Sequence, residues 1–175
     1  MQIVHTPWGE PQHIVLLSED IVSVSTASHG GLKLSDEQNQ LIPEYMRNED
    51  GWYEEDCEWA KVAVVFPPFF KGPERVSAEK VLKHWFPDEW EVFYGKVLKP
   101  GESCTRDEEE FRKNHNDSLL VTSAYGSWAD WVPAGFVGCV AHVGGRDRHG
   151  KANGLERVFL VPAEKYAYKS GWGFL

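Results

Sequence analysis

The stretch QHIVLLSEDIVSVSTASHGGLKLS, residues 12–35, indicates which kind of fold the chain adopts. Residues 12–17 and 21–27 are rich in β-branched and other apolar side chains, and the polar triplet between them predicts a β-hairpin. Ser35 is followed three positions later by a glutamine, a capping box that predicts a helix stopping near Pro43. The N-terminal part is therefore expected to be a strand pair followed by a helix.

Further helices are predicted in the middle of the chain, each bounded by prolines or opened by a capping box. They cover residues 52–66, 77–86 and 106–115. The capping box of the last helix pairs Thr105 with Glu108.

The pattern changes in the C-terminal third. Residues 118–125, 136–143 and 157–162 are β-rich and are separated by clusters of glycine, proline and aspartate, which predicts an antiparallel meander. A chain of 175 residues with 42% apolar residues is about one domain long. We therefore predict a single α+β domain over residues 1–175, with an N-terminal β-hairpin and helices followed by a C-terminal antiparallel sheet.

The negative charge is concentrated at the N-terminal end. The net charge is −9, and residues 1–60 hold 12 acidic and 2 basic residues, whereas residues 111–175 hold 5 and 8. An acidic surface disfavours phosphate, so direct nucleic-acid binding is not expected; it suits a basic protein partner or solubility alone. The eight tryptophans fit either a core or an interface.

Composition also limits location and cofactors. No apolar run approaches the roughly 20 residues of a membrane span, and the first ten residues lack a signal-peptide pattern, so a cytoplasmic protein with no membrane partner is predicted. The three cysteines form no Cys-x-x-Cys pair, and reduced thiols are expected. Cys139 and His142 would face opposite sides of a strand and cannot share an ion without a bulge. No metal and no cofactor are predicted.

His29 is the first candidate functional residue. Period-two geometry places Val22, Val24 and Thr26 on the expected core face of the strand, and Ser23, Ser25, Ala27 and His29 on the other. That small-residue face, next to Gly30-Gly31, predicts a small pocket lined by serines that a ligand can approach closely. Adjacent Ser28 and His29 point apart and cannot form a dyad. The alternatives are a hydrogen-bonded histidine at a strand end and a functional one.

The second candidate region is the acidic block EDGWYEEDCE, residues 49–58. Acids in a first helical turn complement the helix dipole, which accounts for Glu54 and Glu55 without a function. On a helical wheel Asp56 falls among the apolar positions, where a carboxylate needs a partner. For an enzyme, the catalytic residues are therefore expected to be His29, Asp56 and Glu55; the alternative is that Asp56 only caps the helix.

Binding residues are expected in the same blocks and in the loop over residues 144–154, which carries several bases among glycines. The loop suits a phosphate or an acidic surface, or is a solvated hairpin tip. The predicted binding residues are Gly30, Gly31, Trp52, Tyr53, Glu54, Arg146 and Arg148.

Several blocks together resemble an uncharacterised domain family of proteobacterial phages, plasmids and other mobile elements. The blocks are TPWGEPQ (6–12), VSTASHGGLKLS (24–35), GWYEEDCEWAKVAVVFP (51–67), VPAGFVGCVAHVGGRD (132–147) and FLVPAEKY (159–166). The His-Gly-Gly and Trp-Tyr-Glu-Glu-Asp blocks carry most of the likeness. That family has no established activity, so the resemblance implies a context, a small accessory protein of a mobile element, and assigns no catalytic residue.

Three functions follow as expectations, and the last of them is a structural or regulatory binding module with no role in defence. The first is inhibition of a host defence system, of the anti-CRISPR or antirestriction type, by stoichiometric binding of a defence protein or ribonucleoprotein through an acidic surface. The second is a small transferase or hydrolase centred on His29 and Asp56. The His-Gly turn after a strand is similar to the first motif of ADP-ribosyltransferases, whose later tyrosine and glutamate motifs have no evident counterpart here.

Overall fold

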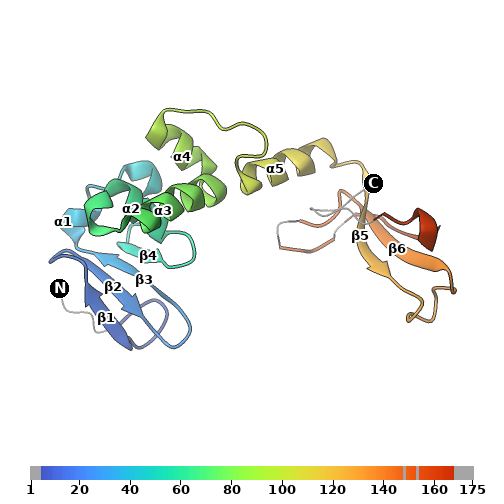
Figure 1. The fold of residues 1–175 in the computed structure, drawn as a ribbon, viewed down its shortest axis with the longest axis horizontal. Coiled ribbons are helices and arrows are strands. Elements are labelled where there is room, and N and C mark those ends of the chain that lie inside the picture. Colours follow the sequence, from blue (N-terminus) through green and yellow to red (C-terminus); the bar gives the residue numbers. More distant parts are fainter. Residues whose placement is uncertain (1–4, 148, 153, 168–175) are drawn as a thin grey trace. The chain divides into compact units, whose positions relative to one another are not determined.

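The computed structural model describes residues 5–147, 149–152 and 154–167 (Figure 1). It contains helices and two antiparallel sheets, one in each half of the chain, so the predicted α+β class is confirmed. The chain divides into two compact units, residues 1–106 and residues 107–175, which are described separately below.

The N-terminal unit contains a four-stranded antiparallel sheet in the order β1-β2-β3-β4. Its strands are β1 (His13–Leu16), β2 (Ile21–Ser25), β3 (Gly30–Leu34) and β4 (Trp52–Glu54). The predicted hairpin is β1 with β2. β3 follows directly from the glycine pair, and it pairs with β2 through Ile21 opposite Leu34 and with β4 through Leu32 opposite Tyr53.

The helices are α1 (Asp36–Asn39), α2 (Trp59–Val65), α3 (Gly72–Trp85), α4 (Pro87–Tyr94) and α5 (Cys104–Asn114). Ser35 caps α1 as predicted, because its hydroxyl accepts the backbone N–H of Gln38 at 3.2 Å. Short 3₁₀ turns lie at Glu44–Met46, Pro67–Phe69 and Ala163–Lys165. Within the described ranges, every helix is too short or too polar to cross a membrane.

The prediction of one helix over residues 52–66 is wrong. Its first three residues form β4, a turn follows, and α2 begins only at Trp59. Tyr53 pairs with Leu32 across β3 and β4 and is fully buried, so sheet pairing outweighs the local helical pattern.

Two other helices begin earlier than the sequence indicates. α3 starts at Gly72, because the carboxylate of Glu74 accepts the N–H of Lys71 at 2.6 Å and closes the first turn. α5 starts at Cys104, and its N-cap is Ser103, whose hydroxyl accepts the N–H of Arg106 at 3.3 Å. The predicted cap at Thr105 is thus two residues too late.

The main core of the N-terminal unit lies between one face of the sheet and the helices drawn above it in Figure 1. Its fully or nearly buried members are Ile21, Leu32, Leu34, Ile42, Met46, Tyr53 and Val62. A second cluster joins α2, α3 and α4 through Ala60, Ala63, Ala78, Leu82 and Trp90. Burial of these apolar surfaces is the main contribution to the stability of this unit.

The strand register corrects the predicted orientation of β2. Opposite residues in a sheet share a face, so Ser23 lies on the core side with its partner Leu32. Val24 lies on the other side, opposite Gly31, and is nonetheless buried. β2 is therefore covered on both faces, a case in which alternation of polar and apolar residues does not identify the core face.

The C-terminal unit contains the predicted meander, in the order β5-β6-β7. The strands are β5 (Leu119–Tyr125), β6 (Phe136–Val143) and β7 (Glu156–Pro162), with a register shift in β5 between Val121 and Ser123. Cys139 is buried in this sheet, as expected of a core thiol.

Candidate functional site

His29 lies in the tight turn that joins β2 to β3. β2 ends at Ser25, and the turn is closed by the backbone N–H of Thr26, which donates to the carbonyl of His29 at 2.7 Å. The Thr26 hydroxyl donates to the same carbonyl at 2.8 Å and accepts the His29 N–H at 3.2 Å. These bonds fix the backbone of His29, while its side chain stays 53% exposed. The predicted continuation of the strand to Ala27 is therefore two residues too long.

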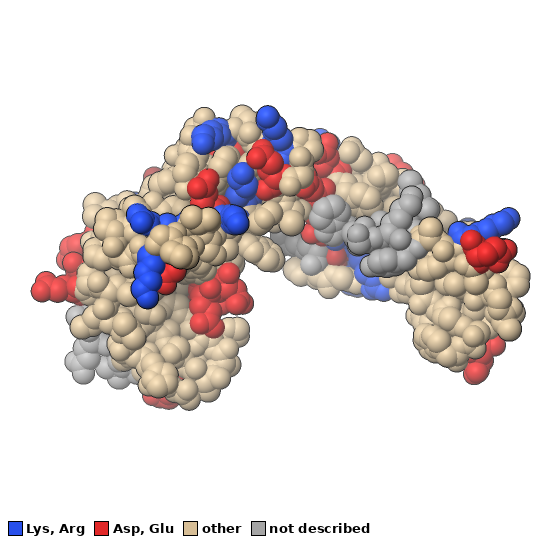
Figure 2. All heavy atoms as spheres, viewed as in Figure 1, with Lys and Arg blue, Asp and Glu red and all other residues tan. Residues whose placement is uncertain are grey.

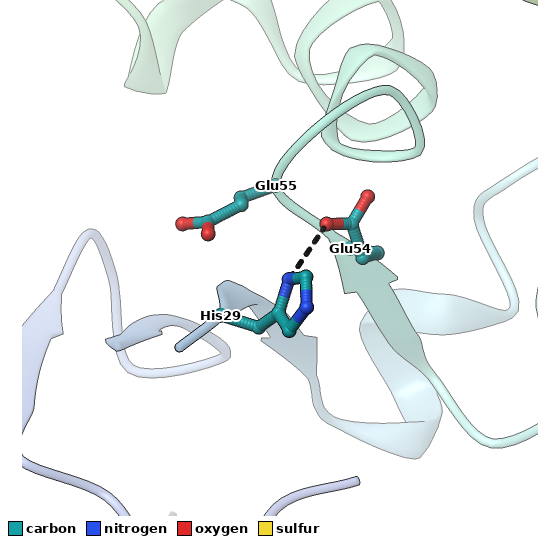
Figure 3. A group of neighbouring side chains, drawn as sticks. All are labelled: His29, Glu54 and Glu55. Atoms are coloured by element: carbon teal, nitrogen blue, oxygen red, sulfur yellow. Dashed lines mark ion pairs between the residues drawn. The ribbon is translucent and has the colours of Figure 1, made fainter. Parts of the chain in front are cut away.

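Two carboxylates meet the imidazole at the end of β4 (Figure 3). The N–H of Glu55 donates to the carbonyl of Gly30 at 3.0 Å, which holds the end of β4 beside the start of β3. Nδ1 of His29 lies 3.8 Å from Oε1 of Glu54. One donor atom from each of His29, Glu54 and Glu55 lies within 4.8 Å of the other two. We call these three residues the His-Glu-Glu cluster.

The two glycines after His29 are explained by close contacts. A β-carbon at position 30 would lie 2.6 Å from Oε2 of Glu55. A β-carbon at position 31 would lie 2.4 Å from both the Trp8 ring and the carbonyl of Tyr53. Three separate sequence blocks, around Trp8, around His29 and around Glu54, therefore meet at this end of the sheet.

A cavity of about 540 Å³ opens on the core side of the sheet, next to the cluster. Its walls include polar side chains from β2, from the turn after β4 and from α3, and aromatic side chains from α2 and the segment before α3: Ser23, Ser25, Glu55, Ser77, Trp59 and Phe70. The structure thus has serines lining a pocket beside the glycine pair, but the face of β2 that carries them is on the core side of the sheet, whereas the sequence predicts the opposite side. We call it the serine cavity.

A second hollow, of about 530 Å³, lies next to Glu54 of the cluster. We call it the acidic groove, and it is lined by Pro7, Trp8, Asn48, Glu49, Asp50, Trp52, Glu54 and Glu58. Trp8 and Trp52 meet edge to face, with ring centroids 5.5 Å apart. Figure 2 shows acidic side chains in several separate groups on the N-terminal unit, with lysine and arginine side chains on the same face.

Hydrogen bonds hold the carboxylates around the groove in place. Oε2 of Glu58 accepts the N–H of Glu54 at 3.1 Å and the side-chain amide of Asn48 at 3.0 Å. Burial raises the pKa of the Cys57 thiol, and the nearby charges of Glu54, Glu58 and Asp56 raise it further. The carboxylates of Glu54, Glu58 and Asp56 thus make the surroundings of the thiol negative, which would favour a cation.

Asp56 does not occupy the place that the helical wheel indicates. It lies exposed in the turn before α2, and its N–H donates to Oε2 of Glu54 at 2.7 Å. The partner of His29 is Glu54, which is predicted from the sequence as a binding residue and not as a catalytic one. The adjacent aromatic residues Trp52 and Tyr53 are a signal that favours a strand, and a strand over residues 52–54 would place Glu54 at its end.

The other predicted binding residues lie in different surroundings. Trp52 lines the acidic groove, whereas Tyr53 is buried and its hydroxyl donates to Oδ1 of Asn39 at 2.7 Å. Arg146 is exposed on the C-terminal unit, where its guanidinium donates to the carbonyl of Gly150 at 2.7 Å. Arg148 lies outside the described residues.

Comparison with known proteins gives a family and no activity. Residues 1–116 match the model of a domain of unknown function, DUF7007. No curated protein and no solved structure matches the chain. The matched span contains the His-Glu-Glu cluster, the serine cavity and the acidic groove. Because the match covers well over half of its length, the chain belongs to the DUF7007 family of domains of unknown function.

Proposed function

We propose that the N-terminal unit is a protein-binding module that takes up a basic segment of a partner in the acidic groove. The observation that carries this proposal is the composition of the groove, in which two tryptophans are combined with four carboxylates: Glu49, Asp50, Glu54 and Glu58. Carboxylates attract lysine and arginine over distance, and aromatic faces bind the same cations at contact. A groove with both features suits a cationic side chain better than an apolar or acidic one.

The chain itself contains a small example of this recognition. Nζ of Lys33 lies 5.7 Å from the ring centroid of Trp52 and donates to the carbonyl of Asp50 at 2.6 Å. A lysine or arginine of a partner would find the same combination of ring and oxygen acceptors further along the groove. Tryptophan is also the residue type most often found to dominate binding energy at interfaces.

We further propose that the partner is a component of a host defence system, inhibited by stoichiometric binding. Support comes from the sequence blocks that resemble proteins of mobile elements, and from the charge of residues 1–60, which hold 12 acidic and 2 basic residues. A defence protein that binds nucleic acid has a basic surface, and an acidic groove competes for such a surface. The mode of action is occupation of that surface, without turnover.

Affinity capture with three forms of the full chain tests the proposal. The forms are the wild type, Glu49→Lys in the acidic groove, and Glu79→Lys on the exposed side of α3, which makes the same change in net charge elsewhere on the unit. Proteins captured from a host lysate are identified by mass spectrometry. We expect a basic defence component to be captured by the wild type and by Glu79→Lys, and to be depleted with Glu49→Lys.

The functional consequence is measured in host cells that carry the captured defence system. Phage plating should be restored by the wild type and by Glu79→Lys, and restored less by Glu49→Lys. Capture of no defence component, together with no effect on phage plating by the wild type, would contradict the proposal.

A further inference from the structure

We propose that the His-Glu-Glu cluster binds one divalent transition-metal ion, with zinc as the best match. The three side chains offer one imidazole nitrogen and two carboxylate oxygens, and one donor atom of each lies within 4.8 Å of the other two. Zinc in proteins is commonly held by this kind of mixed nitrogen and oxygen set, and three protein ligands leave a position for water or a ligand.

The local fold brings both carboxylates close to the same imidazole. Successive residues of a strand normally point to opposite faces, and Glu54 accordingly lines the acidic groove while Glu55 lines the serine cavity. At the end of β4 the two side chains nevertheless both lie beside the turn that carries His29, and Figure 3 shows the imidazole between the two carboxylates. Oε2 of Glu54 is held by the N–H of Asp56, and Glu55 rests in the space that Gly30 leaves by having no side chain.

Two carboxylates brought this close repel one another unless a cation lies between or beside them. In the described part of the chain, no lysine or arginine forms an ion pair with Glu54 or Glu55, and the positive partner found there is His29, when protonated. A metal ion supplies two positive charges at the point where the three side chains meet. A neutral imidazole can also act as a ligand of the metal ion through its unprotonated nitrogen.

Occupation requires rotation of the three side chains. Donor atoms that each lie about 2.1 Å from a tetrahedral ion are about 3.4 Å apart. Donor atoms that lie within 4.8 Å of one another must therefore close in by up to about 1.4 Å. His29 and Glu54 have side chains that are 53% and 22% exposed, so they can rotate without disturbing the core. The backbone that carries them is fixed by the turn bonds of Thr26 and by the bond from Glu55 to Gly30.

The position of the ion indicates what it would bind. Glu55 is shared between the cluster and the serine cavity, so the ion would lie at the edge of a space of about 540 Å³ whose lining combines serines with apolar side chains. Its remaining coordination positions would take water or an oxygen atom of a small ligand, such as a carboxylate or phosphate group, in that cavity. This inference does not depend on the proposed protein partner.

Metal binding to the full chain, stripped with a chelator, tests the inference by calorimetric titration with Zn²⁺ and, separately, Mn²⁺. We expect one Zn²⁺ per chain, with the affinity lowered about tenfold or more in each of His29→Ala, Glu54→Gln and Glu55→Gln. His13→Ala, at an exposed histidine of β1, is the matched control and should leave the affinity within about twofold of the wild type. Mn²⁺, which does not favour thiolates, should show the same ranking of variants.

A competing zinc site would involve a thiol, because the N–H of Cys104 donates to Nδ1 of His84 at 3.3 Å and the two residues are neighbours. The Cys104→Ser variant removes the thiol of the competing site and leaves the His-Glu-Glu cluster unchanged, so it shows which of the two sites binds zinc. The inference is overturned if the wild type takes up no zinc, if zinc binding is lost in Cys104→Ser and kept in His29→Ala, or if the three cluster variants bind zinc as the wild type does. Circular dichroism of each variant confirms that the fold is intact.

Discussion

Gly31 lies where three parts of the N-terminal unit touch, and no side chain fits there. A β-carbon would lie 2.4 Å from the ring of Trp8 and 2.4 Å from the backbone oxygen of Tyr53, and the latter cannot move without breaking the pairing of β3 with β4. We predict that Gly31→Ala lowers the free energy of unfolding by about 1–3 kcal/mol, measured by denaturant titration.

Gly72→Ala is the matched control for Gly31→Ala. Gly72 is the first residue of α3, and a β-carbon there has no neighbour within 4 Å. Alanine favours a helix over glycine by up to about 1 kcal/mol, so this variant should be as stable as the wild type or slightly more so. Equal stability of the two variants would contradict the packing described for the glycine pair.

Tyr53 gives a prediction that depends on pH. Its buried hydroxyl donates to Asn39 Oδ1 at 2.7 Å and accepts the Asn48 N–H at 3.1 Å, and burial raises its pKa above the ordinary value of 10.0. Above pH 10 the unfolded chain therefore loses this proton while the folded chain keeps it, so the contribution to stability is complete below pH 10 and declines as the pH rises.

Tyr53→Phe should have two effects. It should cost about 1–3 kcal/mol at neutral pH, because it leaves buried polar groups of Asn39 and Asn48 without their partner. It should also make stability fall less steeply above pH 10, as followed by denaturant titration at several alkaline pH values. If the free energy of unfolding falls equally steeply with pH in the wild type and in Tyr53→Phe, burial does not raise the pKa of Tyr53.

At the scale of the element, the N-cap of α5 is Ser103 in the structure, whereas the sequence pattern predicts Thr105. The hydroxyl of Ser103, 1% exposed, accepts the N–H of Arg106 and donates to the carbonyl of His84 in α3, both at 3.3 Å. We predict that Ser103→Ala costs about 1 kcal/mol or more, whereas Thr105→Ala, at the cap that the sequence predicts, costs little. Thermal unfolding of both variants measures the difference, and a larger loss in Thr105→Ala would contradict the assigned cap.

How well the elements could be predicted depended on what stabilises each of them. The β1–β2 hairpin and the C-terminal meander follow from short-range alternation and turn residues, and both are present. The two glycines of β3 are not typical of a strand, and the acidic block that contains β4 also suits a helix. Both strands form through pairing with distant residues, such as Leu32 with Tyr53. A local pattern does not contain that information.

The same reason explains what could be known of the site. His29, the glycine pair and Glu55 were candidates because histidine, glycine and acids are functional residue types in a recognisable setting. Glu54 was not expected to meet His29, because the two meet only once β4 pairs with β3. The serine cavity was expected from residues of one strand, whereas the acidic groove combines Trp8 with residues 48–58 and could not be seen in any single stretch.

At the scale of the molecule, residues 1–116, the span matched by the family model, should fold without the rest of the chain. Both apolar clusters of the N-terminal unit are built from residues within 17–98, so the fragment contains its whole core. We predict a single cooperative thermal transition for the fragment, followed by circular dichroism, and the same partner and metal binding as the full chain. A fragment that is unfolded or aggregated would show that the predicted single domain over residues 1–175 is needed for folding.

The central claim is that the acidic groove binds a basic segment of a protein partner. Its most direct test is the affinity of the captured partner for the purified full chain, measured by calorimetry at low and high salt with the wild type, Glu49→Lys and Glu79→Lys. The claim predicts that Glu49→Lys weakens binding about tenfold, that Glu79→Lys changes it by less than about threefold, and that salt weakens the wild-type complex. The claim would be contradicted if Glu49→Lys and Glu79→Lys changed the affinity equally, or if salt did not change the affinity.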